Sequence, residues 1–233
     1  MFLSFVFPVF ARRNRAGLLP LFAVAALLMT VSNTQAQFAP PSPGTQVHDP
    51  AALRPPAGAR VAIVEFEDME CPDCSRANPL LREAAAKYNI PWVRHDFPLP
   101  FHPWSMQAAV NARWFDTKSK KLGDEYRDAV FAAQLSLGED PNLLRQFTEK
   151  FAADRKIALP FAIDPQGKLQ AAVKADYALG QRVGIEHTPT IWVVTANSKG
   201  APFVEVVDRS KLFQMIDQAL EDTKGAVTRT AHQ

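Results

Sequence analysis

The chain contains only two cysteines, Cys71 and Cys74, and their placement constrains the fold more than any other feature. An apolar run, Val61 to Phe66, ends shortly before them, and a segment rich in Ala, Leu and Arg continues from Cys74 to Tyr88. The apolar run predicts a buried strand, and the composition of the following segment predicts a helix. The two thiols are therefore expected where a strand passes into a helix.

Three uses of such a pair make different demands on the rest of the chain. A structural disulfide between residues three apart closes a small loop, so it contributes little stability. A zinc site needs four ligands, and no two of the five histidines have ligand spacing. A redox pair needs only a sulfur at a helix start, where unpaired N–H groups and the helix dipole stabilise a thiolate. The sequence favours the redox use, and no metal is expected.

Hydrophobic periodicity and turn residues predict the other elements. They are a second strand, a helical block, a hairpin of two strands and a last helix, at residues 91–97, about 100–184, 190–195 with 202–207, and 212–220. Asp140-Pro141 and Asp164-Pro165 are helix start signals, and Gly184 is an end signal. The order is β-α-β, a helical block and β-β-α, which indicates a small α/β domain with one sheet, parallel first strands and a helical insertion.

Residues 1–36 have the pattern of a signal peptide. Three arginines and no acid precede and flank an apolar run, Gly17 to Val31, and Ala36 ends a small-residue site. The run is shorter than the roughly 20 apolar residues of a membrane-spanning helix. We expect cleavage after Ala36 and an extracytoplasmic, periplasmic domain, where disulfides persist. An uncleaved membrane anchor and a buried N-terminal helix are the alternatives.

Composition outside that segment sets the remaining boundaries. Without the three arginines the formal charge falls from +2 to −1, which leaves no basic excess for nucleic-acid phosphates. Residues 37–60 are dense in proline and predict an extended linker or arm with little to offer the core. The domain itself is then expected at residues 61–222, followed by a C-terminal tail at residues 223–233.

Two separated motifs carry a resemblance to a known family. Val-Glu-Phe-Glu-Asp-Met-Glu-Cys-Pro-Asp-Cys, together with His187-Thr-Pro-Thr190, resembles the thioredoxin superfamily, specifically its DsbA-like exported branch. The resemblance spans about residues 61 to 220 and includes Phe97 to His102, which resembles the start of the inserted domain. It implies a thioredoxin fold, with a central mixed sheet flanked by helices and an inserted helical domain.

The resemblance also implies an activity and roles for individual residues. Cys71 would be the nucleophile and Cys74 the resolving thiol of a thiol-disulfide oxidoreductase, with no cofactor beyond their disulfide. Pro189 would be a cis-proline facing that disulfide, and the backbone of Thr188 would pair with an extended substrate chain. Glu65, six residues before the first cysteine, matches a buried acid that accepts or relays the proton of the resolving thiol.

Other residues near the cysteines are expected to tune the chemistry. Pro72 and Asp73 separate the two thiols, and an aspartate there should disfavour the thiolate and raise the pKa of Cys71. Strongly oxidising relatives carry histidine at that position, and Thr188 is more usual in reductases and isomerases. His187 would tune the thiolate or contact substrate, or would be an ordinary loop histidine.

Three further acids, Glu67, Asp68 and Glu70, precede the first cysteine. Two interpretations stay open for them and for Asp73: they add to the repulsion of a thiolate, or they form a solvated rim whose charge salt screens.

The resemblance implies partners for this protein and leaves two alternative functions open. Partners would be cysteine-containing exported proteins and a membrane redox partner, and a monomer is expected because only a proline-rich arm precedes the first strand. One alternative is an exported reductase or isomerase of the same fold. Another is a non-catalytic module that holds peptides on the Thr-Pro face, although such a module has no need of both thiols.

Overall fold

The structure is a computed structural model that describes residues 44–196 and 198–225. The elements in chain order are η1 (Pro50–Ala52), β1 (Val61–Glu67), α1 (Pro72–Tyr88), β2 (Trp92–Asp96), α2 (Ser105–Asp116), α3 (Lys120–Leu137), α4 (Pro141–Asp154), α5 (Lys168–Val183), β3 (Thr190–Thr195), β4 (Phe203–Glu205), η2 (Arg209–Lys211) and α6 (Leu212–Asp222). This order confirms the predicted succession of strands and helices. The expected signal peptide, residues 1–36, lies outside the described residues.

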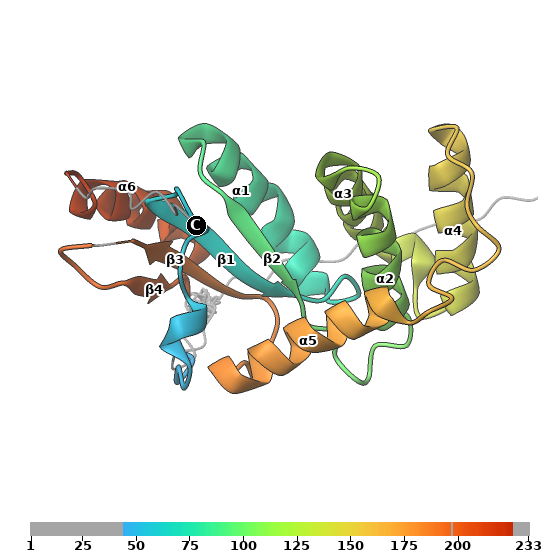
Figure 1. Cartoon of the computed structure of the whole chain (residues 1–233), viewed down its shortest axis with the longest axis horizontal. Coiled ribbons are helices and arrows are strands. Elements are labelled where there is room, and N and C mark those ends of the chain that lie inside the picture. The colour runs from blue at the N-terminus through green and yellow to red at the C-terminus, as the bar shows by residue number, and fades with distance from the viewer. Residues whose placement is uncertain (1–43, 197, 226–233) are drawn as a thin grey trace, which may run out of the picture. The chain divides into compact units, whose positions relative to one another are not determined.

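The four strands form one mixed sheet in the order β2-β1-β3-β4 (Figure 1). β1 pairs in parallel with β2 and antiparallel with β3, and β4 completes a hairpin with β3. The register places Glu65 of β1 between Arg94 of β2 and Ile191 of β3. A central mixed sheet is therefore confirmed, and it carries an acid in its middle strand.

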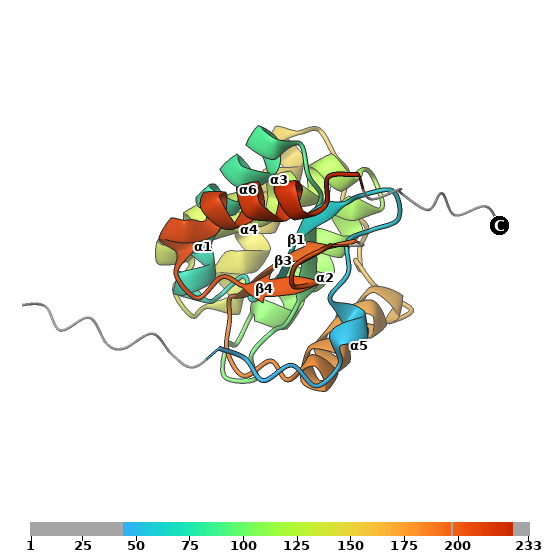
Figure 2. The ribbon, with the colours of Figure 1, turned by 90° about the vertical axis from the view of Figure 1, so that its left-hand side faces the viewer.

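Successive side chains of β1 point to opposite faces of the sheet, and different helices cover the two faces. Val61 and Ile63 pack with α1 and α6, whereas Ala62 and Val64 pack with residues near the end of α5. Figure 2 shows α1 and α6 on one side of the sheet and α5 on the other. All seven residues of β1 are buried, as expected for the middle strand of a sheet covered on both faces.

The inserted helices α2, α3 and α4 build a separate aromatic core. Phe115, Tyr126 and Phe151 pack with ring centroids between 4.7 and 5.2 Å apart. Asp140 caps α4 as predicted, because its side chain accepts a hydrogen bond from the backbone N–H of Asn142. The insertion is thus stabilised by its own apolar contacts, and it packs against α1 and α5 (Figure 1).

Helix α5 differs from the prediction in its start and in its role. It begins at Lys168 rather than at Pro165, because Gly167 adopts a left-handed conformation (φ 68°) that cannot be part of a right-handed helix. The Asp164 carboxylate instead accepts a hydrogen bond from the backbone of Gln170. Val173 joins the core of the insertion and Val183 joins the core of the sheet, so α5 connects the two.

The expectation that the arm offers little to the core is wrong for its described part, residues 44–60. Leu53 is 1% exposed and packs with the face of the sheet that α5 covers. The backbone N–H of His48 donates to the carbonyl of Val183 at the end of α5. Composition pointed to an extended arm, but one leucine on a short 3₁₀ turn suffices to anchor it.

No helix within the described ranges is long and apolar enough to cross a membrane.

The anchoring of the arm can be tested by truncating its buried side chain. Leu53→Ala should lower the free energy of unfolding by about 2–4 kcal/mol, because it removes a fully buried leucine and leaves a cavity. Urea denaturation followed by circular dichroism measures this change. Arg54→Ala, at the exposed neighbouring position, is the matched control and should have little effect. Equal stabilities of the two variants would show that the arm contributes nothing to the core.

Candidate active site

Both cysteines lie at the start of α1, directly after the loop that follows β1. Cys71 is the N-cap residue of the helix, with extended backbone angles, and Pro72 is its first helical residue. Cys74 lies one turn further in and is 0% exposed, whereas 8% of Cys71 is exposed. Both are free thiols in this structure. The outer sulfur is thus the one that a protein substrate can approach.

A loop from the other end of the domain faces the outer sulfur. The Thr188–Pro189 peptide bond is cis, as the resemblance implied. In its protonated form Cys71 donates a hydrogen bond to the carbonyl oxygen of Thr188, with 3.3 Å between sulfur and oxygen. The Thr190 hydroxyl donates to the carbonyl of His187 and holds the loop. The two predicted motifs therefore meet, although 117 residues separate Cys71 from Thr188.

The surroundings of Cys71 favour its thiolate. A hydrogen bond from the Cys74 thiol is the largest influence and, with the backbone N–H groups of Asp73 and Cys74, lowers the pKa of Cys71 to about 5. Partial burial acts in the opposite direction but is outweighed. At neutral pH the outer cysteine is therefore a thiolate.

Cys74 behaves in the opposite way. Burial raises the pKa of Cys74 well above its ordinary value, and its hydrogen bond to Cys71, the charge of Cys71 and the charge of Glu65 raise it further. The backbone N–H of Asp68 points at its sulfur across 3.4 Å. The pair thus consists of one accessible thiolate and one buried thiol, which is the asymmetry that disulfide exchange requires.

Glu65 is a buried carboxyl group in the middle of the sheet. Its Oε2 accepts a hydrogen bond of 2.9 Å from the indole Nε1 of Trp92, and its Oε1 has no hydrogen-bond partner among the described residues. Burial, followed by the charge of Glu67, raises the pKa of Glu65 well above its usual range. It is not an ordinary glutamate at a strand end, because it holds its proton to higher pH beside a buried thiol.

Asp73 does not act as predicted. The pKa of Cys71 is lowered, not raised, and the charge of Asp73 is not among the main causes, so the expected rise does not appear. Two arginines pair with its carboxylate: Arg209 at 2.7 Å and Arg76 at 3.0 Å. Its backbone N–H also favours the thiolate. The sequence showed the acid next to the nucleophile but not the arginines that neutralise it.

The interpretation of the other three acids as a solvated rim is also wrong, because all three are buried. The Glu67 carboxylate accepts hydrogen bonds from Nε and Nη2 of Arg94. The Asp68 carboxylate is 2.7 Å from His102 Nδ1, and Glu70 accepts from the backbone N–H of Trp104. Buried charges need such partners. Asp68 and Glu70 fasten the loop before Cys71 to the start of the insertion, and Glu67 pairs β1 with β2.

Sequence reasoning missed two residues that contact this loop. Gln134 of α3 donates through Nε2 to the carbonyls of Met69 and Cys71, at 2.7 and 3.0 Å. Arg209 of η2 reaches Asp73. Their partners in the motif lie 63 and 136 residues away, and neither residue belongs to a motif. His187 and Pro72, which were predicted, are exposed beside the site.

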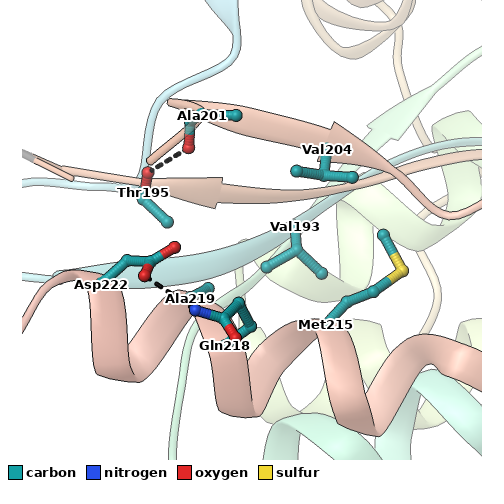
Figure 3. A pocket seen from close by; sticks show the side chains of 8 residues that line it. All are labelled: Val193, Thr195, Ala201, Val204, Met215, Gln218, Ala219 and Asp222. Atoms are coloured by element: carbon teal, nitrogen blue, oxygen red, sulfur yellow. Dashed lines mark hydrogen bonds between the residues drawn. The ribbon is translucent and has the colours of Figure 1, made fainter. Parts of the chain in front are cut away.

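Other parts of the described domain have no comparable chemistry. No group of three or more His, Cys, Asp or Glu side chains in the described ranges could hold a metal ion. A small cavity of about 180 Å³ lies between α6 and the β3–β4 hairpin (Figure 3). Its lining is mainly apolar, with Val193, Val204 and Met215 pointing into it, and it contains no residue of the thiol site.

Comparisons with known proteins agree with this geometry. The sequence model of the thioredoxin family matches residues 56–209. Alpha-DsbA1 from Wolbachia pipientis has a similar structure, with a TM-score of 0.55 and 17% identity over 79% of this chain and 96% of its own. DsbA2 from Pseudomonas aeruginosa has a TM-score of 0.53 and 24% identity, over 73% and 94% of the two chains. These likenesses show the fold, including the helical insertion.

One more solved structure and one curated protein are also similar to this chain. A periplasmic thioredoxin-like protein from Salmonella enterica serovar Typhimurium is similar with a TM-score of 0.55 and 20% identity, over 74% of this chain and 92% of its own. Among curated proteins, the Na(+)/H(+) antiporter NhaA 1 of Salinispora arenicola is 29% identical over 162 residues. That match covers 66% of this chain but only 23% of the antiporter, so the chain spans about a quarter of that relative.

The asymmetry of the two thiols predicts how the reduced protein titrates. The thiolate absorbance of the wild type should rise with a midpoint at pH about 5, because only Cys71 ionises there. Cys74→Ala should shift that midpoint upward, since it removes the largest influence on the pKa of Cys71. Cys71→Ala, which keeps only the buried thiol, should show no midpoint in the acid range. A wild-type midpoint near the ordinary thiol value of about 8.5 would contradict the assignment.

Proposed function

The chain belongs to the thioredoxin family and has the fold of its DsbA-like members, and from this premise we propose that it is an enzyme, an exported thiol-disulfide oxidoreductase that exchanges disulfides with cysteines of other proteins through Cys71 and Cys74. One observation carries the proposal: an accessible sulfur with a pKa of about 5 lies one turn from a buried thiol whose pKa is raised. A staple or a binding module would gain nothing from this difference.

We propose oxidation of substrate dithiols as the direction. With the Cys71–Cys74 disulfide formed, a substrate thiolate attacks the Cys71 sulfur, and the bond to Cys74 breaks. Cys74 leaves with the electron pair and takes up a proton. A second substrate thiolate then attacks the substrate sulfur of the mixed disulfide, and Cys71 leaves as a thiolate. Two electrons pass from the substrate to the enzyme, and the substrate gains a disulfide.

The hydrogen bonds that the Cys74 thiol and the backbone N–H groups of Asp73 and Cys74 donate to Cys71 support this direction. They stabilise the thiolate of the reduced enzyme, and a stabilised thiolate makes the disulfide form more oxidising. The resemblance argued against a strong oxidase on two grounds, Asp73 and Thr188. The argument from Thr188 still stands as a prediction, whereas the carboxylate of Asp73 is paired with two arginines. We therefore favour an oxidase over a reductase or isomerase of the same fold.

The Thr188–Pro189 loop supports a protein as the substrate. Pro189 is buried against the site, and the carbonyl of Thr188 lies 3.3 Å from the Cys71 sulfur. An extended substrate segment could pair with this backbone as an added strand and bring its cysteine to Cys71. His187, exposed beside the loop, could contact the same segment. Substrates are proposed to be cysteine-containing exported proteins.

The reaction is proposed to take place outside the cytoplasm. Residues 1–36 have the pattern of a signal peptide, which would deliver the domain to an oxidising compartment. The Cys71–Cys74 disulfide is proposed to be the sole redox group, with no further cofactor. A membrane partner would restore it by accepting the two electrons. We expect the protein to act as a monomer.

The roles of the two thiols predict which variant traps substrates. Cys74→Ala should accumulate mixed disulfides between Cys71 and exported proteins. They form when the Cys71 thiolate attacks a disulfide of such a protein and displaces one of its thiolates, and they persist because Cys74 is no longer present to attack the Cys71 sulfur and release the protein. Cys71→Ala should trap almost none, since the remaining sulfur is fully buried. Non-reducing gels of periplasmic extracts, with mass spectrometry of the captured peptides, make the comparison. Equal trapping by the two variants would reverse or abolish the assigned roles.

The raised pKa of Glu65 predicts how the rate at which Cys74 resolves a mixed disulfide depends on pH. We expect the attack of Cys74 on a mixed disulfide to accelerate as pH rises through the raised pKa of Glu65, because the ionised carboxylate then accepts the thiol proton. Glu65→Gln should slow this step severalfold and abolish the acceleration. Stopped-flow release of a fluorescent peptide from the mixed disulfide measures the rate.

Trp92→Phe is the matched control for that experiment. It removes the indole hydrogen bond that lowers the pKa of Glu65 and keeps an aromatic ring beneath Arg82 and Arg94. The acceleration should therefore move to higher pH rather than disappear. A Glu65→Gln profile identical to that of the wild type would remove Glu65 from the mechanism.

A further inference from the structure

Arg209 contacts the active-site helix in two places. Its Nη2 lies 2.7 Å from Oδ1 of Asp73, and its Nη1 donates to the backbone carbonyl of Asp73 across 3.2 Å. The arginine belongs to the short helix η2, which directly precedes α6. A segment near the end of the domain therefore contacts Asp73, one of the two residues between the cysteines.

The two arginines that pair with Asp73 differ in exposure. The side chain of Arg76 is 67% exposed and that of Arg209 is 33% exposed. Water and salt screen an exposed pair, so such pairs contribute little. Both arginines contact Oδ1 of Asp73, at 2.7 Å for the less exposed one and at 3.0 and 3.2 Å for the more exposed one. The less exposed and closer partner neutralises Asp73 more effectively. That partner is Arg209.

The same arginine acts on the buried acid of the site. The positive charge of Arg209 lowers the pKa of Glu65, against the larger effect of burial. The guanidinium group is thus close enough to influence Glu65 while it contacts Asp73 directly.

We propose that Arg209 is a positioning residue for the thiol chemistry proposed above: it holds the Asp73 carboxylate in a neutralised pair, so that an acid two residues from the nucleophile does not oppose the Cys71 thiolate. A purely structural role, in which Arg209 only fastens η2 to α1, is the competing explanation. The two roles differ in whether the effect of removing Arg209 depends on the charge of Asp73.

The test is a double-mutant cycle read by thiolate titration. Arg209→Gln should leave Asp73 largely uncompensated and raise the measured pKa of Cys71 by about half a unit, which is the order expected for a partly exposed pair. The equilibrium constant with glutathione should become roughly threefold less oxidising. The double variant Arg209→Gln/Asp73→Asn should return both values close to those of the wild type, because the opposing charge is gone.

Two further variants serve as controls. Arg76→Gln removes the exposed partner of Asp73 and should shift the pKa of Cys71 much less than Arg209→Gln. Arg209→Lys keeps the charge but loses the two-point contact and should fall between wild type and Arg209→Gln. Thermal unfolding of each reduced protein shows that the fold is kept, and the lysine variant provides the measurement if the glutamine variant does not fold.

The outcomes separate this inference from the proposed function. If Arg209→Gln leaves the pKa of Cys71 unchanged, or shifts it equally with and without the Asp73 charge, Arg209 has only a structural role. That result leaves the oxidoreductase proposal standing as long as the wild type exchanges disulfides with a peptide substrate. If the wild type exchanges none, the proposed function fails, while the titration still measures whether Arg209 and Asp73 are coupled through the Cys71 thiolate.

Discussion

The hydrogen bond from the Cys74 thiol to the Cys71 sulfur is the interaction on which the rest of the site depends. It is the largest influence that lowers the pKa of Cys71, and it forms only because α1 places the two residues one turn apart. The helix in turn is held against the sheet by apolar residues such as Leu81 and Ile63. The fold therefore keeps the inner thiol dry and leaves the outer sulfur accessible, and the difference in pKa follows from that arrangement.

Burying charged side chains near the active-site loop costs free energy, and ion pairs and hydrogen bonds offset that cost. Arg94 neutralises Glu67, and His102 contacts Asp68, at the junction of the sheet and the insertion. Removing one member of such a pair would leave an uncompensated buried charge. Gln134 adds a neutral contact from α3 to the carbonyl of Cys71. The insertion thus covers the active-site loop and also satisfies its polar groups.

Two expectations failed for the same physical reason. An acid beside the nucleophile should oppose a thiolate, but Asp73 is paired with Arg209, 136 residues further along the chain. A proline-rich arm should contribute little to the core, but Leu53 packs on the sheet. In both cases the deciding contact comes from a distant segment, and the local pattern does not contain it. The start of α5 failed locally, because a glycine and an aspartate hydrogen bond moved it past Asp164-Pro165.

Much of this structure could be predicted from the sequence alone, because it follows from interactions within a few residues. Alternation of apolar residues, the cap at Asp140 and the spacing of the cysteines specify the elements and place a thiol at a helix start, because those effects act within a few residues. The loop at Thr188 and Pro189 was found through the family resemblance. Only the tertiary structure decided that Glu65 is buried with a raised pKa and that Arg209 neutralises Asp73. Burial and charge pairing depend on which distant segments meet, and no short stretch of sequence records that.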